Sequence, residues 1–221
     1  MIVRLFCSTI VSRSDAARVR ARGMGVLCAA TTSNFLPSKI LDGIPMAVDN
    51  GAFGFWRRGL KFDAAPMWRA LSAVAKHGLS PEWIVCPDIV AGGKASLDFS
   101  VDWSNRLADW PLAVAVQDGM EPADLMPTLH LWRCVFVGGS LHWKWHTAEA
   151  WSDFARLHGL QCHIGRVGTL GDMVMAKRVG ATSCDSSTIN RGNRRSGVGT
   201  WGDVDMFLRG EYEADLFTAH H

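Results

Sequence analysis

The chain has 221 residues, of which 48% are hydrophobic and 20% are charged, and its formal net charge is +2. This composition is typical of a globular protein and excludes an intrinsically disordered chain, and the length suits one sizeable core, so we expect a single domain over residues 1–221. No uninterrupted apolar stretch approaches the length of a membrane span, and so small a net charge neither requires nor excludes a nucleic-acid partner.

The N-terminal segment, MIVRLFCSTIVSRSD, is short and is interrupted by Arg4 and Arg13, so we interpret it as the first strand and not as a signal peptide. The cysteines are scattered singly, without a CxxC pair or zinc-finger spacing. They are Cys7, Cys28, Cys86, Cys134, Cys162 and Cys184. Most lie within apolar runs, which favours reduced core cysteines. The sequence therefore predicts a cytoplasmic protein with no zinc site, no cofactor and no membrane contact.

Short apolar runs rich in β-branched residues recur along the chain, and each is typical of a buried strand. They cover residues 2–6, 25–29, 46–48, 83–86, 112–116, 134–137, 161–164 and 181–184. Segments with helical spacing lie between most of them, at residues 14–22, 64–77, 97–108, 148–158 and 170–179. This alternation predicts an α/β fold with a parallel sheet, closed into a compact (β/α)8 TIM-type barrel. An open doubly wound sheet is the alternative.

Polar residues or glycines lie just after each run from the third to the eighth, with Pro87 between the fourth run and Asp88. They are Asp49, Asp88, Gln117, Gly138-Gly139, Gly165-Arg166 and Asp185. The C-terminal ends of parallel barrel strands point to one face, where barrel enzymes hold their chemistry. A polar turn residue after any one strand is common, but carboxylates, an amide and a Gly-Gly pair after successive strands favour a shared site.

Asp49 and Asp185 are the candidate catalytic pair. Two carboxylates at one barrel mouth can divide the chemistry, one attacking a sugar carbon and the other transferring protons. Simpler interpretations stay open for each residue. Asp49 could form an Asx turn before Gly51, and Asp185 could be a helix N-cap or a turn residue.

Candidate binding groups for a flat, polar ligand accompany this pair. Asp88 could accept hydrogen bonds from a purine-like N–H edge, and Gln117 offers both a donor and an acceptor. Gly138-Gly139 would leave backbone N–H groups open to a ligand carbonyl. Phe53 could stack on a planar ring, or it could be a core aromatic.

Arginines and tryptophans supply candidate contacts to a polynucleotide. The segment INRGNRRSG holds Arg191, Arg194 and Arg195, which are candidate phosphate contacts, although a solvated loop is the simpler interpretation. The stretch GRVGT, residues 165–169, resembles a phosphate-binding glycine loop, and Arg166 within it could equally be a surface charge. The tryptophans of SLHWKWH could wall the mouth or pack a helix.

Five short elements, in chain order, resemble motifs of the tRNA-guanine transglycosylase superfamily. VDNGAF resembles its D-S-G-G-F/Y-Q element, VAVQDG its V-Q-G-G element and FVGGS its I-G-G-L element. GRVGT resembles the G-V-G-T element, and CDSSTINR resembles D-C-V-x-P-T-R. The elements span residues 47–191, and proteins of this superfamily fold as a (β/α)8 barrel, in agreement with the strand pattern.

The resemblance implies that guanine in a polynucleotide is exchanged for a 7-deazaguanine such as preQ0, through a covalent glycosyl-aspartate intermediate. It implies that Asp185 is the nucleophile and Asp49 the general acid and base. We therefore predict substrate contacts from Asn50, Phe53, Asp88, Gln117, Gly138, Gly139 and Arg166, and nucleic-acid contacts from Arg191, Arg194 and Arg195.

The chain also departs from the family pattern. Asn50 stands in place of a serine, Gly54 stands in place of a glutamine, and the Cys-rich zinc region that helps the family to hold tRNA has no counterpart. This favours a zinc-less, DNA-type relative, like the phage and bacterial enzymes that insert 7-deazaguanines into DNA. The alternatives are a tRNA-guanine transglycosylase, a nucleosidase or glycosidase on the same barrel, and a non-catalytic nucleic-acid-binding barrel.

Overall fold

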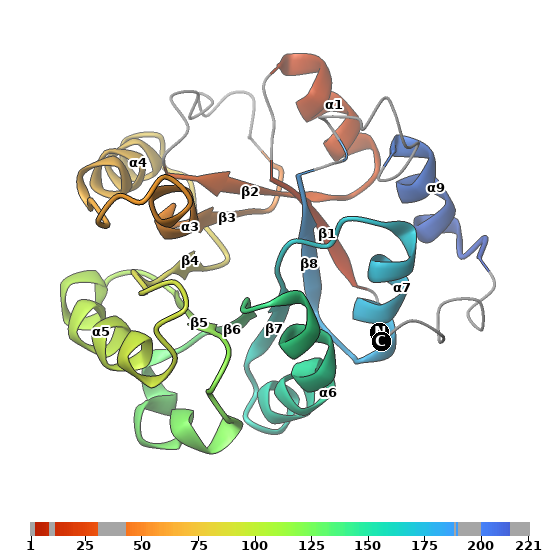
Figure 1. Cartoon of the computed structure of the whole chain (residues 1–221). Coiled ribbons are helices and arrows are strands. Elements are labelled where there is room, and N and C mark those ends of the chain that lie inside the picture. Colours follow the sequence, from red (N-terminus) through yellow and green to blue (C-terminus); the bar gives the residue numbers. More distant parts are fainter. Residues whose placement is uncertain (1–2, 9–11, 31–42, 188, 190–199, 213–221) are drawn as a thin grey trace.

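The computed structural model describes residues 3–8, 12–30, 43–187, 189 and 200–212, and these form a closed parallel barrel (Figure 1). The strands are β1 (Arg4–Cys7), β2 (Gly25–Ala29), β3 (Met46–Asp49), β4 (Ile84–Val85), β5 (Leu112–Val116), β6 (Cys134–Val137), β7 (Gln161–Ile164) and β8 (Ser183–Ser186). Each strand pairs in parallel with the next one in the chain, and β8 pairs with β1 to close the barrel. The (β/α)8 prediction is therefore confirmed, and the open sheet is excluded.

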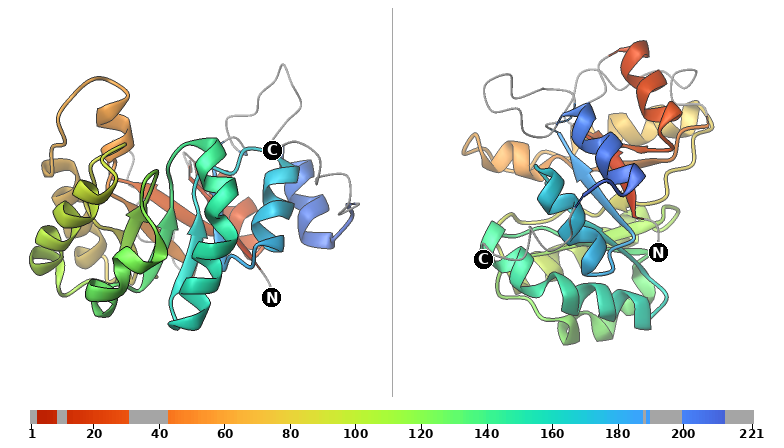
Figure 2. Two further views of the ribbon diagram at one scale, coloured as in Figure 1. Left: turned by 60° about the horizontal axis from the view of Figure 1, so that its bottom comes forward. Right: turned by 90° about the vertical axis from the view of Figure 1, so that its right-hand side faces the viewer.

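Helices surround the barrel (Figures 1 and 2). They are α1 (Arg13–Ala21), α3 (Ala52–Trp56), α4 (Ala65–Lys76), α5 (Lys94–Ser104), α6 (Leu141–Leu157), α7 (Leu170–Arg178) and α9 (Trp201–Arg209), with the 3-10 segments η1 (Asn105–Leu107) and η2 (Pro122–Leu131). No helix in the described ranges combines the length and the apolar character that a bilayer crossing requires.

Helix α6 begins seven residues earlier than the helical spacing predicted. Ser140 is its N-cap, and the Ser140 side chain accepts a hydrogen bond from the backbone N–H of Trp143. The first turns of α6 therefore carry the tryptophans of SLHWKWH, and Trp145 is buried in the core between the barrel and its helices. Helix packing is thus the correct interpretation for Trp145. The short helix α3 and the helix α9 were not predicted.

Aromatic rings fill the interior of the barrel. Phe6 on β1, Trp83 before β4, Phe136 on β6 and His163 on β7 contact one another there. The His163 ring stacks on Phe136 with centroids 4.9 Å apart and meets Trp83 edge-on at 4.8 Å. The interior is therefore a packed core and not a pore, so a ligand must bind above it, at the strand ends.

Two strand-end glycines make room for these rings. A Cβ atom at Gly25 would lie 2.6 Å from the ring of Phe6, and one at Gly165 would lie 2.7 Å from the ring of Phe136. Both distances are shorter than van der Waals contact, so any larger residue would push the ring out of the interior.

The cysteines behave as core residues. Five of the six are buried, Cys28 is half-buried, and none is joined to another by a disulfide. Burial raises the pKa of the Cys86 and Cys162 thiols to about 12. These thiols stay protonated at neutral pH and are unreactive, as expected for structural cysteines.

The apolar run at 181–184 predicted the eighth strand, but β8 begins and ends two residues later, at Ser183 and Ser186. Its residues Ser183, Cys184, Asp185 and Ser186 are all buried, and Asp185 pairs in register with Phe6 of β1. The apolar run misplaced the strand because its inward-facing positions, Ser183 and Asp185, are polar. Asp185 is therefore a residue within a strand, and the N-cap and turn interpretations for it are wrong.

Candidate active site

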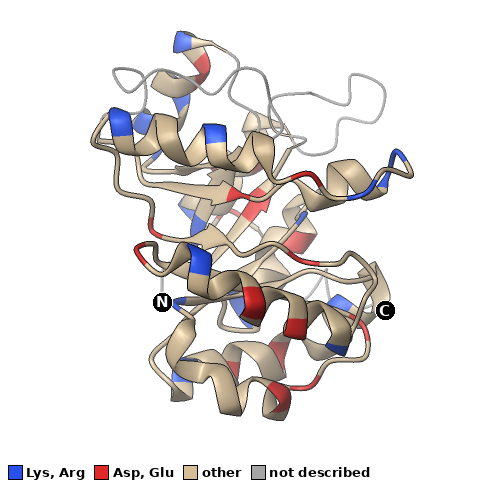
Figure 3. Cartoon of the chain, turned by 90° about the vertical axis from the view of Figure 1, so that its left-hand side faces the viewer, with Lys and Arg blue, Asp and Glu red and all other residues tan. Residues whose placement is uncertain are grey.

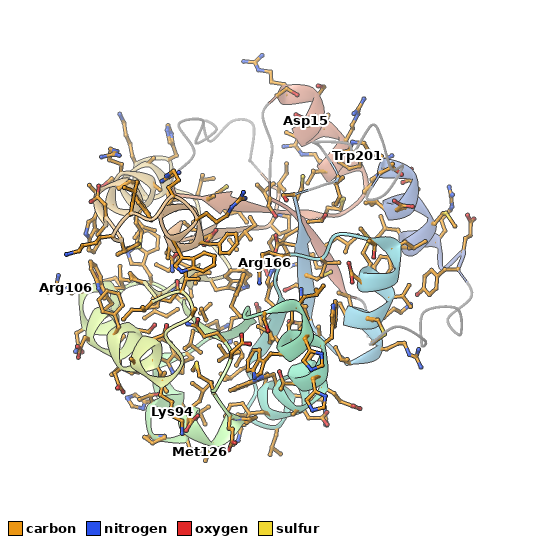
Figure 4. The ribbon with its side chains drawn as sticks, in the orientation of Figure 1. Asp15, Lys94, Arg106, Met126, Arg166 and Trp201 are labelled. Carbon is orange, nitrogen blue, oxygen red and sulfur yellow. The ribbon has the colours of Figure 1, made fainter. Side chains whose placement is uncertain are left out.

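The predicted strand-end residues gather on the C-terminal side of the barrel, and hydrogen bonds join the segments that carry them. Asn50 after β3 donates to Asp88 after β4, with 2.8 Å between Nδ2 and Oδ1. Gln117 after β5 donates to the backbone oxygen of Ile89 at 2.9 Å. Arg166 after β7 donates through Nη2 to the backbone oxygen of Gly139 after β6. In Figure 4, Arg166 lies near the centre of this face.

Asp185 is held by donors from three neighbouring segments. Its Oδ1 lies 3.1 Å from Nε2 of His163 and accepts the backbone N–H of Arg166 at 2.9 Å. Its Oδ2 accepts the hydroxyl of Ser8, which directly follows β1. The residue is only 5% exposed. These donors hold the carboxylate in one orientation at the bottom of the mouth.

The donors also decide the charge of Asp185. Burial acts to raise the pKa of Asp185, but the hydrogen bond and electrostatic attraction of His163, with the hydrogen bonds from Ser8 and the Arg166 N–H, outweigh burial and lower the pKa below its ordinary value. Asp185 is therefore an ionised carboxylate at neutral pH.

Asp49 is the last residue of β3 and is half-buried. Its Oδ1 accepts the backbone N–H of Gly51 at 3.2 Å, which confirms the Asx-turn interpretation. Burial, together with the charges of Asp88 and Asp185, raises the pKa of Asp49 to about 6, although the hydrogen bond from the Gly51 N–H opposes this shift. The turn therefore positions a carboxyl group that can take up and release a proton near neutral pH.

The two carboxyl groups of the predicted pair thus have pKa values displaced in opposite directions. The pKa of Asp185 is lowered by its donors, whereas burial and neighbouring charge raise the pKa of Asp49. Because the charge of Asp185 itself acts on Asp49, the two groups lie in one electrostatic neighbourhood. Such a pair can divide the roles of ionised nucleophile and proton carrier.

Asn50 was predicted to contact the substrate directly, but the protein itself uses its amide group. Its Nδ2 donates to the backbone oxygen of Cys86 and to Asp88, each at 2.8 Å, and its Oδ1 accepts the backbone N–H of Ala52 at 2.7 Å. The residue is 2% exposed. Asn50 therefore positions Asp88 and ties the ends of β3 and β4 together.

Asp88 is half-buried above this amide. Burial raises the pKa of Asp88 to about 6, and the hydrogen bond from Asn50 opposes that shift. A carboxylate has about four acceptor sites, so the hydrogen bonds from Asn50 and from the Asp88 backbone N–H leave acceptor capacity for a ligand. The position suits the predicted contact with an N–H edge.

The Gly138-Gly139 pair differs from its prediction. The N–H of Gly138 donates to the backbone oxygen of Val116 at 2.9 Å, so it extends the pairing with β5 and is not open to a ligand. Gly139 has a φ of 71°, and its carbonyl oxygen accepts the guanidinium of Arg166. Gly139 therefore shapes the mouth through its backbone conformation and holds Arg166.

Phe53 and Arg166 form an exposed pair at the rim of the mouth. Phe53, on α3, is 37% exposed, so the core-aromatic alternative is wrong. The guanidinium carbon of Arg166 lies 4.8 Å from the centroid of the Phe53 ring. Arg166 also has a φ of 56°, a left-handed conformation that aims its N–H at Asp185. One residue thus links the buried carboxylate to the exposed ring.

Lys144 is a functional candidate that the sequence analysis missed. It lies on α6, is 1% exposed, and donates through Nζ to the backbone oxygens of Gly165 at 2.8 Å and Arg166 at 3.3 Å. Burial, together with the charge of Arg166, lowers the pKa of Lys144 to about 8. Lys144 therefore fixes the turn that presents the Arg166 N–H to Asp185. A lysine between two tryptophans in the first turn after a Ser N-cap was the available signal.

His163 was also missed, although its strand was predicted to the residue. Its neighbours Cys162 and Ile164 face the outer core, so alternation along β7 places His163 inside the barrel. There its Nδ1 lies 2.8 Å from the hydroxyl of Ser183, and its Nε2 faces Asp185. A histidine at an inward position, between the apolar residues Cys162 and Ile164, was the signal.

The stretch GRVGT does not form a phosphate loop. The backbone N–H groups of Gly168 and Thr169 both donate to the carboxylate of Asp172, at 3.1 and 3.0 Å. Asp172 therefore occupies the position that an anion would take at the start of α7. The predicted nucleic-acid contacts Arg191, Arg194 and Arg195 lie outside the described residues.

No cluster of His, Cys, Asp and Glu side chains with the makings of a metal site occurs within the described ranges. No model of a known protein family matches the chain, and no curated protein matches it significantly. The function is therefore argued from the geometry of the site and from the motif resemblance.

Proposed function

We propose that the protein is a base-exchanging transglycosylase that replaces guanine in a polynucleotide, preferably DNA, by a 7-deazaguanine such as preQ0. The main support for this proposal is the pair formed by Asp185 and Asp49 at one barrel mouth. The pKa of Asp185 is lowered, and the pKa of Asp49 is raised to about 6. The order of the five motifs that resemble the transglycosylase superfamily supports the choice of guanine.

In the first step a carboxylate oxygen of Asp185 attacks C1′ of the target nucleotide. Oδ1 already accepts two hydrogen bonds and Oδ2 accepts one from Ser8, so Oδ2 has the more open lone pairs. The C1′–N9 bond breaks and its electron pair leaves with guanine, which takes a proton from the neutral form of Asp49. The product is a glycosyl ester of Asp185.

In the second step the incoming 7-deazaguanine gives its ring N–H proton to ionised Asp49 and attacks C1′ through the same nitrogen. The ester bond breaks, and its electron pair returns to Asp185. A pKa of about 6 lets Asp49 exist in both forms near neutral pH, as this alternation requires.

The surrounding residues suit a planar purine. The ionised form of Asp88 can accept the N–H edge of guanine, and Gln117, which is 4% exposed, completes the wall on the β5 side. Phe53 lies at the rim with its ring stacked on Trp56. The guanidinium of Arg166 lies over that ring and can contact a phosphate or a base carbonyl.

Covalent trapping tests the proposal. The protein is incubated with guanine-containing DNA and the mixture is run on a denaturing gel, with Asp185→Asn as the comparison. We expect a protein–DNA adduct for the wild type and none for the variant. An identical adduct with Asp185→Asn would remove Asp185 from its proposed role.

Product analysis then separates base exchange from the alternatives. Mass spectrometry after incubation with preQ0 is expected to find the deazaguanine in the DNA and free guanine in solution. Free guanine with abasic sites would indicate a nucleosidase, and exchange in tRNA but not in DNA would indicate a tRNA enzyme. Nucleoside analysis of cellular DNA with and without the gene extends the same test to the cell.

A further inference from the structure

A segment of exposed aromatic and basic residues projects beside the candidate active site. Residues 53–62, here named the α3 arm, comprise most of α3 and the chain that follows it. Trp56 is 51% exposed and Leu60 is 54% exposed. Arg57, Arg58 and Lys61 are also exposed. The arm stands out from the side of the barrel to which the strands point (Figure 2, left), and Lys and Arg gather at the end of that projection (Figure 3).

A row of planar groups connects the arm to the candidate nucleophile. The backbone of Arg166 binds Asp185, and the Arg166 guanidinium lies 4.8 Å from the ring of Phe53. The Phe53 ring in turn stacks on Trp56, with centroids 5.6 Å apart and 26° between the ring planes. The row therefore runs outward from the buried carboxylate to an exposed indole ring.

The arm is anchored, so its exposed groups are presented in a fixed arrangement. Phe62 packs edge-on against Phe55, Phe99 and Trp103, with centroids 6.1, 6.5 and 6.2 Å away. The backbone N–H of Leu60 donates to the oxygen of Phe55 at 3.0 Å and closes the turn. The anchoring uses Phe55 and Phe62, whereas Trp56 contacts Phe53 and stays 51% exposed. Phe53 and Trp56 are both exposed and stack on each other, and a contiguous exposed aromatic surface of this kind marks an interaction site.

The charge on the arm is of one sign. Residues 53–62 contain Arg57, Arg58 and Lys61 and no acidic residue. Among the described residues, none of these three side chains forms an ion pair with a carboxylate. Asp63 follows the arm, but its Oδ1 accepts the backbone N–H of Ala65 at 2.9 Å. With Asp63 counted, residues 53–63 hold three basic side chains and one carboxylate, so the arm presents net positive charge next to exposed ring faces.

We propose that the α3 arm binds an unpaired segment of DNA that flanks the reacting nucleotide. A base stacks on Trp56, and the phosphates on either side contact Arg57, Arg58 and Lys61. Basic side chains interleaved with aromatic rings are the arrangement that single strands require, because every base has a ring face and every linkage carries a negative charge. An acidic protein partner would satisfy the charges but not the stacking row that leads to Asp185. The choice of DNA rests on the proposed function.

Fluorescence anisotropy with a labelled thymidine oligonucleotide tests the arm. This probe contains no guanine, so binding is measured without base exchange. We expect Trp56→Ala to weaken binding by about tenfold, since stacking of one base has this order of effect. The double variant Arg57→Ala with Arg58→Ala should also weaken binding. The slope of its log affinity against log salt should become shallower by the amount that corresponds to the loss of about two phosphate contacts.

Matched controls come from α4, which carries the same residue types outside the arm. Trp68 is 39% exposed and Arg69 is exposed, so Trp68→Ala and Arg69→Ala remove comparable groups. Both variants should bind the oligonucleotide as the wild type does. Equal losses for Trp56→Ala and Trp68→Ala, or no loss for Trp56→Ala, would overturn the proposal. So would tighter binding of duplex DNA or of a uridine oligonucleotide than of the thymidine strand, or full displacement of the strand by an acidic peptide.

The outcomes also separate this inference from the proposed function. If the wild type binds the oligonucleotide through Trp56 but forms no adduct with guanine-containing DNA, the arm is supported and base exchange is not. If base exchange proceeds and Trp56→Ala changes neither oligonucleotide binding nor the Michaelis constant for DNA, the arm is not the contact and the proposed function stands.

Discussion

His163 and Asp185 face each other inside the barrel, with Nε2 of the histidine 3.1 Å from Oδ1 of the aspartate. The pair belongs to a chain of polar groups that runs from the hydroxyl of Ser183 through His163 and Asp185 to the hydroxyl of Ser8. Because these residues come from both ends of the sequence, the ionised state of Asp185 depends on closure of the barrel.

Replacing His163 by Phe should raise the pKa of Asp185. The substitution keeps a ring against Phe136 but removes the hydrogen bond that favours the ionised carboxylate. A carboxyl group with a lowered pKa stabilises the fold above its unfolded pKa of about 3.9 and loses that contribution as the pH falls through the folded pKa. We expect His163→Phe to lose about 1–3 kcal/mol of unfolding free energy at pH 8 and less near pH 4.

The acidic limb of the pH–rate profile should also move to higher pH in His163→Phe. Urea unfolding at both pH values and base-exchange rates between pH 4 and 8 measure the two effects. His77→Phe, at the exposed C-cap of α4, is the control and should change neither. An unchanged acidic limb would mean that His163 does not set the charge of Asp185.

Replacing Asp49 by Asn should stabilise the protein while it lowers activity. Burial first, and the charges of Asp88 and Asp185 next, raise the pKa of Asp49 to about 6, so the folded state holds its proton more tightly than the unfolded state. Stability therefore falls as the pH rises from about 4 to 6. Asn carries no charge and can still accept the Gly51 N–H. We expect Asp49→Asn to gain about 1–3 kcal/mol at pH 8, with turnover reduced at least ~10²-fold.

Asp63→Asn is the matched control for Asp49→Asn, because Asp63 accepts a backbone N–H two residues on in the same way but is exposed. Its stability and turnover should follow those of the wild type. Urea unfolding at pH 4 and pH 8 is the measurement. A gain for Asp49→Asn that is equal at both pH values would contradict a raised pKa.

Replacing Lys144 by Met should change how stability depends on alkaline pH. Burial, and then the charge of Arg166, lower the pKa of Lys144 to about 8, so the unfolded state binds its proton more tightly than the folded state. Stability of the wild type should therefore rise between about pH 8 and 10.5, by up to ~3 kcal/mol from this group. The Met variant lacks this rise, and so the difference between the two proteins should grow across that window.

Turnover of Lys144→Met should fall by about tenfold, because the carbonyl groups of Gly165 and Arg166 lose their donor and the turn loses its fixed conformation. Lys76→Met, at the exposed end of α4, is the control for the lysine change. Thermal unfolding from pH 7 to 10.5 and the KM and kcat values give the comparison. If the stabilities of Lys144→Met and the wild type change with pH in parallel, burial does not lower the pKa of Lys144.

Replacing Gly139 by Ala should be more destabilising than replacing Gly119 by Ala. Both glycines have positive φ, 71° and 83°, so both variants bear the left-handed strain of about 1–2 kcal/mol. At Gly119 a Cβ atom meets nothing within 4 Å, whereas at Gly139 it would lie 2.6 Å from both Asp118 Oδ2 and Trp143 Cε3. We expect about 2–4 kcal/mol for Gly139→Ala, measured by urea unfolding. Equal losses for the two variants would show that Asp118 and Trp143 move aside easily.

The strands that the sequence predicted best are those with apolar residues on both faces. The predicted runs at 25–29, 112–116 and 134–137 agree with β2, β5 and β6 to the residue, because a buried parallel strand needs no polar position. The run at 161–164 also agrees with β7, although His163 points inward. The run at 181–184 was displaced from β8 because Ser183 and Asp185 point inward and bind His163. The early start of α6 was missed because packing of Trp145 and Lys144, and not periodicity, decides its first turns.

The order of apolar runs and strand-end polar residues by itself predicted the barrel, the face on which the candidate site residues gather, and the candidate pair Asp49 and Asp185. Only the tertiary structure decided how each carboxyl group behaves. The pKa of Asp185 depends on Ser8 and His163, and the turn beside it depends on Lys144, all distant from Asp185 along the chain. Hydrogen bonds and burial act over a few ångströms in space, so their effect on a carboxyl group follows from barrel closure and from side-chain packing, which local sequence does not encode.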